Sequence, residues 1–498
     1  MNFARVHTRA QVGVDAPAVS VEVHLSGGLP AFNIVGLPET AVRESRDRVR
    51  AAIANSGFNP PGRKITVSLA PADLPKDGGR FDLPIALGIL VASRQLKTER
   101  LDEFEFLGEL SLAGEVRGVA GCLPAILAVR DAGRCLVLPR ANGVEGGLVG
   151  NAECRLADDL AGVCAMLTGK AELARPEPVC TDGVRERPDL SDVRGQARAR
   201  RALEIAAAGG HNLLMIGPPG TGKTLLASRL PGILPELSED EALETAAIGS
   251  VCGRALDPQR WRERPFRTPH HTASGVALVG GGARPRPGEI SLAHNGVLFL
   301  DELPEFSRHV LEVLREPLES GRIVISRAAI QSEFPSRFQL VAAMNPCPCG
   351  YAGDESGRCH CSPDQIHRYR SKISGPLLDR IDLHVEVPRQ KISRYPPGEP
   401  SHAVRERVAA VRSVQTRRAG LNAHLDEAAL RAHCPLDKAG EKLLESACER
   451  LNLSARAHGR IRKLARTIAD LEGAGKIANA HLAEAIGYRQ LDRPLATI

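Results

Sequence analysis

The sequence GPPGTGKT occupies residues 217–224, between the apolar run HNLLMI (211–216) and the run LLASRL (225–230), which favours a helix. This is the G-x-x-x-x-G-K-[ST] pattern in the strand–loop–helix context that it requires. Its glycines let backbone N–H groups surround phosphates, and the start of the following helix favours negative charge. Lys223 is placed to reach the β- and γ-phosphates, and Thr224 to hold Mg²⁺. The loop therefore predicts a nucleotide site made of eight residues: Gly217, Pro218, Pro219, Gly220, Thr221, Gly222, Lys223 and Thr224.

Two further apolar runs end in polar residues that suit the same site. GVLFLDE, at 296–302, predicts a buried parallel strand followed by two carboxylates, and LVAAMN, at 340–345, predicts a similar strand followed by an amide. Ligands of open α/β sheets bind at the carboxyl ends of the strands. There Asp301 can hold Mg²⁺, Glu302 can polarise the attacking water and Asn345 can orient it. A strand end with solvated acids is the alternative, but a base beside a phosphate loop favours hydrolysis over binding alone.

The segment GPLLDRID, at 375–382, places one arginine among apolar residues and acids. Taken alone, it is compatible with a local salt bridge between Arg380 and Asp379 or Asp382. However, the order and spacing of the phosphate loop, the Asp-Glu strand, the Asn strand and this segment resemble the AAA+ ATPase family. The resemblance implies that ATP and Mg²⁺ are bound, and that Arg380 is a finger that reaches the ATP of a neighbouring subunit in a ring.

The same resemblance assigns a role to the C-terminal region. Residues 401–498 are rich in Ala, Leu, Arg and Glu at helical spacing, so an all-helical region is predicted, similar to the AAA+ lid. The segment LSAR, at 453–456, resembles the second sensor of the family, which makes Arg456 the candidate for that role. Arg460 is the alternative, because both arginines lie on one predicted basic helix.

Longer motifs narrow the resemblance. FRTPHHT (266–272), GGG (280–282) and RPGEISLAH (286–294) closely resemble the YifB/ComM family of magnesium-chelatase-subunit-like, competence-associated bacterial ATPases, and the resemblance covers the whole chain. The family implies a homo-oligomeric ring, a hexamer, that moves on single-stranded or branched DNA. It would drive branch migration as incoming strands are integrated in natural transformation or recombination, alongside recombination proteins.

Two other functions stay open. One is an AAA+ ATPase that remodels a protein or acts, as a chelatase-type subunit, on a protein partner. The other is a scaffold that only changes shape with nucleotide, and the intact Glu302 argues against it.

Length and composition agree with a multidomain folded chain. The 498 residues suggest about three domains at roughly 100–200 residues each. We expect a mixed α/β domain over 1–168, a polar linker over 169–188, the ATPase domain over 189–400 and the lid over 401–498. With 43% hydrophobic and only 3% aromatic residues, the core must be aliphatic. No apolar run approaches the ~18 residues of a membrane helix, and the start lacks a signal-peptide pattern, so a cytoplasmic protein without a membrane partner is predicted.

Three motifs of the first region resemble the Lon protease domain, which has an S5-like α/β fold: GLPETAVRES (36–45), LPKDG (74–78) and GELSLAGEV (108–116). That domain needs a Ser nucleophile shortly after the second motif and a Lys downstream to activate it. Here the Ser position holds Arg80 and the Lys position holds Ala125. We therefore expect a Lon-like domain that is catalytically inactive.

Cysteines gather in one loop, at 347–361, directly after the Asn strand: Cys347, Cys349, Cys359 and Cys361. Two C-x-C pairs could wrap one tetrahedral Zn²⁺. This spacing is less common than C-x-x-C, and four reduced thiols in an ordered loop are the alternative. Such a zinc ion would stiffen the loop and do no chemistry, because four thiolates leave no open position.

Two insertions are candidates for DNA contact. An alternating apolar run, a polar tip and a returning run predict a hairpin over 318–334. In the related AAA+ branch a hairpin at this place points into the pore, so Arg322 and Arg327, the latter at or near the tip, are predicted to meet DNA. Phe266 and Arg267 lie in the second insertion, where basic and aromatic groups suit contact with the DNA backbone without base readout. Surface loops with solvated charges are the alternative for both insertions.

Overall fold

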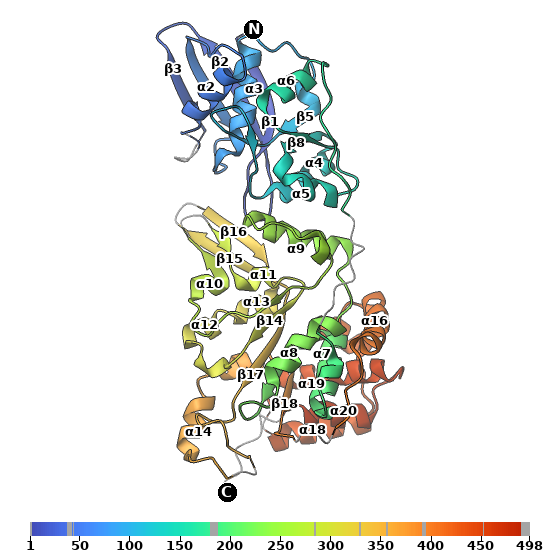
Figure 1. The fold of residues 1–498 in the computed structure, drawn as a ribbon. Coiled ribbons are helices and arrows are strands. Elements are labelled where there is room, and N and C mark those ends of the chain that lie inside the picture. Colours follow the sequence, from blue (N-terminus) through green and yellow to red (C-terminus); the bar gives the residue numbers. More distant parts are fainter. Residues whose placement is uncertain are drawn as a thin grey trace.

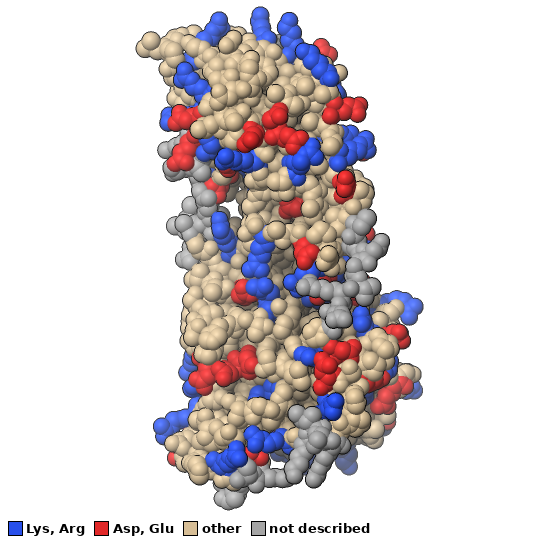
Figure 2. Space-filling view, in the orientation of Figure 1, with Lys and Arg blue, Asp and Glu red and all other residues tan. Residues whose placement is uncertain are grey.

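The computed structural model shows three parts, with the N-terminal part at one end, a second sheet in the middle and the C-terminal helices packed beside that sheet (Figure 1). Acidic and basic side chains are interspersed over the face shown in Figure 2, in keeping with the small net charge of +6. None of the helices in the described part of the chain is both long enough and apolar enough to cross a membrane. The described residues are 2–36, 42, 44–179, 188–282, 285–327, 330–354, 357–390, 395–451 and 453–489.

The N-terminal part is built on a mixed seven-stranded sheet with the order β3-β4-β2-β1-β5-β8-β9. Burial alternates along the strand β2, where Val19, Val21, Val23 and Leu25 are buried, because one face of the sheet is covered. Helix α3 is buried almost throughout and packs on β1 and β2. The strands are β1 (Phe3–Arg9), β2 (Ala18–Ser26), β3 (Ala31–Val35), β4 (Lys64–Ala70), β5 (Phe104–Phe106), β8 (Cys135–Pro139) and β9 (Cys154–Ala157), with a small ribbon of β6 (Glu109–Leu110) and β7 (Val116–Arg117). The helices are α2 (Ser45–Asn55), α3 (Asp82–Ala92), α4 (Cys122–Ala132), α5 (Gly143–Leu148) and α6 (Leu160–Leu167).

The central part holds five parallel strands in the order β11-β14-β17-β10-β18. Successive side chains of a strand point to opposite faces, so Leu213 and Met215 of β10 join one core while Leu214 and Ile216 join the other. Burial on both faces explains why the strands over 213–216 and 297–300 are apolar without interruption. The strands are β10 (Leu213–Ile216), β11 (Phe266–Arg267), β14 (Val297–Leu300), β17 (Gln339–Met344) and β18 (Leu383–Glu386), with separate ribbons of β12 (Gly280–Gly281) and β13 (Arg286–Pro287), and of β15 (Arg322–Arg327) and β16 (Ile330–Pro335).

Helices flank both faces of this sheet. The first core places α7 and α8 together with the C-terminal helices, and the second core places the insertion helices and the β15–β16 hairpin on the opposite face. The helices are α7 (Ala197–Gly209), α8 (Lys223–Ile233), α9 (Glu239–Val251), α10 (Gly275–Val279), α11 (Glu289–Leu292), α12 (Arg308–Glu312), α13 (Arg315–Ser320), α14 (Pro363–Arg370) and α15 (Gly375–Leu378).

The C-terminal part is helical over its described residues and shares a core with the sheet. Helices α16 and α19 pack on α7, and α16 also packs on α8 (Figure 1). Ser454 caps α19 by accepting a hydrogen bond from the backbone N–H of Ala457. The helices are α16 (Ser401–Arg418), α17 (Glu427–His433), α18 (Lys438–Leu451), α19 (Ala455–Leu471) and α20 (Asn479–Gly487).

Among the described residues, the N-terminal part contacts the central part through α4 and through the turn after β1. Helices α4 and α9 pack together in one apolar core, where Ser250 of α9 accepts hydrogen bonds from the backbone N–H groups of Gly121 (2.8 Å) and Leu123 (3.2 Å). The turn after β1 also meets strand β16. A Cβ atom on Gly13 would lie 3.0 Å from the carbonyl oxygen of Glu333, so the two backbones are in close contact there.

Part of the predicted linker is bound to the N-terminal part. The backbone N–H of Leu156, on the edge strand β9, donates to the carbonyl oxygen of Ala174 (2.8 Å), and the N–H of Val179 donates to Gly147 (3.3 Å). Edge strands leave backbone groups unpaired, and this segment satisfies some of them. The predicted linker over 169–188 therefore packs on the N-terminal part up to residue 179, while 180–187 lie outside the described residues.

Candidate functional site

The phosphate loop connects β10 to α8 at the carboxyl edge of the sheet, as predicted. Gly220 and Gly222 have φ angles of 75° and 89°, which residues other than glycine rarely adopt. The Lys223 ammonium is buried and donates to the carbonyl oxygens of Gly217 (2.7 Å) and Pro218 (2.9 Å). Burial lowers the pKa of Lys223, whereas Asp301 and Glu302 act to raise it. The loop therefore concentrates one cation at the point where phosphates would bind.

Strands β14 and β17 bring the predicted residues Asp301 and Asn345 to this edge, next to Thr224 of α8. Thr224 Oγ1 donates to Asp301 Oδ2 at 2.7 Å, so a hydroxyl and a carboxylate oxygen already face each other, which suits Mg²⁺. Asn345, at the end of β17, accepts a hydrogen bond on Oδ1 from Lys223 Nζ at 3.2 Å. The structure thus joins residues that are 122 positions apart in the sequence.

Glu302 lies beside this group on a strained backbone. Its φ of 52° is in the left-handed region, and its N–H donates to Asp301 Oδ1 at 2.9 Å. The carboxylate is half-exposed, and its Oε2 lies 3.3 Å from Nδ1 of His271. His271 was not predicted at this site. It follows the two-residue strand β11, which is too short to show in the apolar pattern, but which pairs with β14 and so ends at the same edge.

Arg380 is buried in this chain. Its guanidinium forms an ion pair with Glu319 at 2.5 Å and donates to the carbonyl oxygen of Pro376 at 2.6 Å. The acidic partner is therefore neither Asp379 nor Asp382, so the alternative of a local salt bridge to one of these two acids is not what the structure shows. Glu319 belongs to α13, directly before the β15–β16 hairpin, and links the Arg380 segment to the base of that hairpin.

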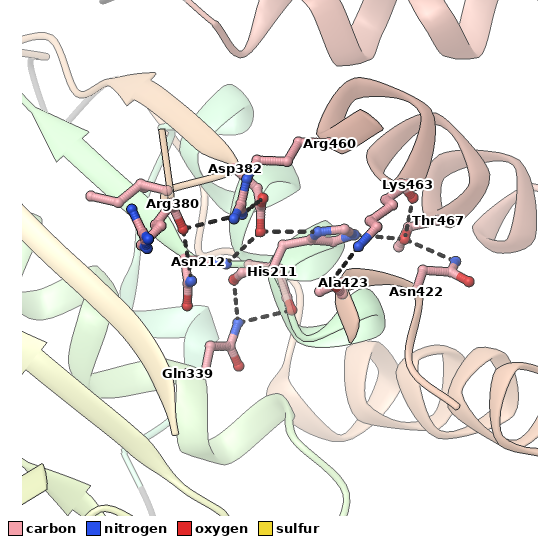
Figure 3. A network of polar contacts seen from close by, with 12 residues as sticks. His211, Asn212, Gln339, Arg380, Asp382, Asn422, Ala423, Arg460, Lys463 and Thr467 are labelled. Atoms are coloured by element: carbon pink, nitrogen blue, oxygen red, sulfur yellow. Dashed lines mark hydrogen bonds and ion pairs between the residues drawn. The ribbon is translucent and has the colours of Figure 1, made fainter. Parts of the chain in front are cut away.

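A buried polar network joins the Arg380 segment to the C-terminal helices (Figure 3). Asp382 binds Arg460 of α19 at 2.5 Å and His211 at 3.3 Å, and His211 in turn contacts Thr467 at 2.7 Å. Burial alone would raise the pKa of Asp382, but Arg460 and His211 hold it well below its ordinary value. Arg460 is thus engaged within the chain, whereas Arg456, in the first turn of α19, is exposed.

Replacing Asp382 with Ala should lower the free energy of unfolding by about 3 kcal/mol, because removing one partner of a buried pair leaves Arg460 uncompensated. Chemical denaturation at pH 7 measures this effect. Since the folded-state pKa of Asp382 is depressed, its stabilisation is present at neutral pH and fades as the pH falls below the ordinary value of 3.8. Asp364→Ala, which removes an exposed carboxylate in the first turn of α14, is the control. Equal losses for both variants would contradict the role given to the network.

Comparisons with known proteins place this geometry in a family. A family model described as magnesium chelatase, subunit ChlI, matches residues 189–395, and a model described as the C-terminal part of subunit ChlI matches 398–489. A third model, described as subunit ChlI of Mg-chelatase, matches 21–142. The uncharacterized protein YifB of Escherichia coli is 53% identical over 502 residues, which cover 99% of this chain and 98% of that protein. The chain belongs to the YifB/ComM family of magnesium-chelatase-like proteins.

Other relatives agree with this assignment. The competence protein ComM of Haemophilus influenzae is 52% identical over 509 residues, which cover 99% of both proteins. The magnesium-chelatase 38 kDa subunit of Cereibacter sphaeroides is 26% identical over 220 residues, which cover 40% of this chain and 58% of that subunit. The predicted fold class is confirmed: an α/β AAA+ core with a helical C-terminal region.

The cysteine loop of this YifB/ComM chain forms a compact cluster. The four Sγ atoms lie within 4.8 Å of one another, and Cys347 Sγ is 3.8 Å from that of Cys359 and 3.3 Å from that of Cys349. All four thiols are free. Thiolates at ~2.3 Å around a tetrahedral ion are roughly 3.8 Å apart, so the observed spacing suits one ion. The N–H of Ala352 also donates to Cys347 Sγ at 3.3 Å. The cluster can therefore hold a metal ion.

The predicted hairpin is present. Strands β15 and β16 pair antiparallel from Arg322 opposite Pro335 to Arg327 opposite Ile330. The connecting residues 328–329 and the side chain of Arg327 lie outside the described part, so the DNA contact of Arg327 stays a prediction. Arg322 pairs with Glu333 at 2.9 Å, and both side chains are more than half exposed. Exposed pairs of this kind contribute only about 0–1 kcal/mol, so Arg322 can exchange Glu333 for a phosphate.

In the second insertion, Phe266 is partly buried. The ring stacks on Phe299 of β14, with centroids 6.0 Å apart, and packs against the core of the sheet. Strand β11 adds Phe266 to the sheet edge instead of leaving it in a surface loop, and its contact with DNA stays a prediction. Arg267 forms a bidentate ion pair with Glu289, at 2.6 and 2.7 Å, and would have to leave it to meet DNA.

The positions that matter in the Lon comparison are buried. Arg80 donates to Gln11 Oε1 at 2.8 Å and to the carbonyl oxygen of Ala120. Ala125 lies inside α4 without exposed surface. Neither position offers a nucleophile or a base. This is the chemical reason for the prediction that the domain is catalytically inactive.

Proposed function

We propose that this chain is an ATP-hydrolysing motor that acts on single-stranded or branched DNA. The observation that carries the proposal is the convergence of a buried lysine, a hydroxyl–carboxylate pair, a second carboxylate and an amide at one sheet edge: Lys223, Thr224, Asp301, Glu302 and Asn345. In this proposal Lys223 binds the phosphates, Thr224 and Asp301 hold Mg²⁺, Glu302 polarises the attacking water and Asn345 orients it. A relative named as a competence protein supports DNA as the substrate.

The proposal includes a ring of identical subunits, a hexamer, working in the cytoplasm with recombination proteins. Arg380 would contact the ATP of a neighbour after leaving Glu319, and Arg456 would contact the ATP of its own subunit. The exposure of Arg456, in contrast to the engaged Arg460, supports this choice of second sensor. Branch migration during integration of incoming strands is the process that such a ring would drive.

The direct test is the ATPase rate with and without single-stranded and branched DNA. We expect DNA to stimulate hydrolysis. Stimulation by an unfolded polypeptide instead of DNA would favour the protein-remodelling or chelatase-type alternative, which the similarity to a magnesium-chelatase subunit keeps in view.

Arg327→Ala should weaken binding of single-stranded DNA about equally for different sequences, because a phosphate contact carries no base preference. The slope of log affinity against log salt should fall by about 0.7 for each lost contact with a single strand. Anisotropy titrations at several salt concentrations measure both effects. Lys438→Ala, which removes an exposed charge at the start of α18, is the matched control. Identical curves for the two variants would remove Arg327 from the DNA site.

We also propose that the cysteine cluster holds Zn²⁺ in a purely structural role. Reduced, untagged protein purified without added zinc should contain about one Zn²⁺ per chain, since four thiolates make one tetrahedral site. The double variant Cys349→Ser, Cys359→Ser should contain none and should unfold at a lower temperature. Metal analysis that finds no zinc in the wild-type protein would contradict the proposal.

A further inference from the structure

The cysteine loop lies against the phosphate loop. Gly350, between the two C-x-C pairs, has a φ of 87°, and a Cβ atom there would lie 2.8 Å from Cδ of Pro219. The same atom would lie 3.9 Å from the side chain of Asn345. The backbone of Gly350 is therefore in van der Waals contact with the second proline of GPPGTGKT, and only glycine fits this approach.

Pro219 sits one residue from the atoms that organise the phosphate loop. The carbonyl oxygen of Pro218 accepts hydrogen bonds from Lys223 Nζ and from Thr221 Oγ1, both at 2.9 Å. A displacement of Pro219 moves this carbonyl, and with it the lysine that faces the phosphates. Gly350 thus touches Pro219, and the preceding residue, Pro218, accepts the hydrogen bond from Lys223. The position of Gly350 is coupled in this way to the cation of the nucleotide site.

The cysteine loop has few other restraints near this contact. Its described residues contain no helix or strand between β17 and α14. Arg370 of α14 donates to the carbonyl oxygen of Pro346 at 3.2 Å, and the N–H of Gly350 donates to that of Cys347 at 3.0 Å. Ordering a backbone without secondary structure is costly, so a cross-link through four thiolates is the main feature that can hold this loop in place.

We propose that the metal-bound cysteine loop braces the phosphate loop, so that nucleotide affinity depends on a metal that takes no part in the chemistry. This inference rests on the zinc proposal above. Metal binding would fix Gly350 against Pro219 and keep the Pro218 carbonyl and Lys223 in their binding arrangement. Loss of the metal would release the loop and loosen the nucleotide site, while the residues of the site itself stay intact.

Two glycines of the same loop provide a matched test in the full-length protein. Gly350 and Gly353 have similar φ angles, 87° and 79°, so alanine introduces similar backbone strain at both. Among the described residues, a Cβ on Gly353 meets nothing within 4 Å, whereas one on Gly350 meets Pro219. We expect Gly350→Ala to keep its zinc and to bind a fluorescent ATP analogue about tenfold more weakly, because small displacements of binding groups have effects of this size or larger. Gly353→Ala should match the wild type in both measurements.

Two further measurements keep the inference testable if Gly350→Ala does not fold. Pro219→Ala removes the other side of the contact. This variant should bind the ATP analogue more weakly, while its zinc content should stay the same as that of the wild type. Wild-type protein stripped with a chelator should lose affinity for the analogue and regain it on addition of zinc, whereas the Cys349→Ser, Cys359→Ser variant should not regain it.

The outcomes separate the two proposals. Wild-type protein without zinc overturns both the metal site and the brace. Zinc that is present, but whose removal leaves analogue binding unchanged, overturns the brace and leaves the metal site standing. The same conclusion follows if Gly350→Ala and Gly353→Ala bind the analogue equally well with full zinc.

Discussion

Glu302→Gln should bind ATP normally and hydrolyse it about 10³-fold more slowly, since general-base catalysis contributes 10²–10⁴. The amide keeps the shape of the side chain but cannot take a proton from water, and the neighbouring Asp301–Thr224 pair survives. Equilibrium binding of a nucleotide analogue and steady-state turnover measure the two effects separately. Glu305→Gln, an exposed carboxylate on the same segment, is the control and should turn over normally. Normal turnover by Glu302→Gln would mean that the base lies elsewhere.

Lys223→Ala should lose the earlier step, which is the binding of ATP. The loop would lose the cation that now binds the carbonyl oxygens of Gly217 and Pro218 and the side chain of Asn345. A variant that does not bind ATP, next to one that binds but does not hydrolyse it, distinguishes the two roles assigned to this sheet edge.

Arg380→Ala should bind ATP and hydrolyse it at least 10³-fold more slowly, as expected for the loss of an arginine finger. Mixing it with Lys223→Ala protein should restore part of the activity, because one mixed interface then combines an intact ATP site with an intact Arg380. Turnover across a series of mixing ratios measures the rescue. No rescue, once co-assembly is shown, would count against a shared site.

A control separates this role from the ion pair inside the chain. Glu319→Gln removes the charge that now holds Arg380 at 2.5 Å but leaves the arginine in place. If Arg380 acts on a neighbour, Glu319→Gln should keep most of the activity. If the ion pair itself supports the fold, both variants should lose activity alike.

The parts of the site that follow from local pattern could be predicted from the sequence. The runs 213–216, 297–300 and 340–344 are apolar because both faces of their strands are buried. The first is followed by the phosphate loop, and the other two end in polar residues that meet this loop at one edge. Parallel pairing of β10 with β17 is then enough to predict that Asn345 lies close to Lys223.

Contacts that depend on tertiary packing could not be predicted in this way. Glu319 reaches Arg380 because α13 folds back over the second face of the sheet, and nothing in the local sequence distinguishes it from other surface acids. The two-residue strand β11 explains two contacts that the sequence did not indicate: it packs Phe266 against Phe299 and carries His271 to Glu302. A strand of two residues leaves no periodic signal.

The close approach of Gly13 to Glu333 has a mechanical consequence. The hairpin strand β16 rests on a turn that belongs to the N-terminal sheet, so in the proposed motor a movement of the hairpin would not be confined to the central part. Either the turn would move with the hairpin, or their contact would open and close in every cycle. In both cases the flexibility of the N-terminal turn would add to that of the hairpin, and residues far from the nucleotide would help to set the length of each step that the proposed motor takes along DNA.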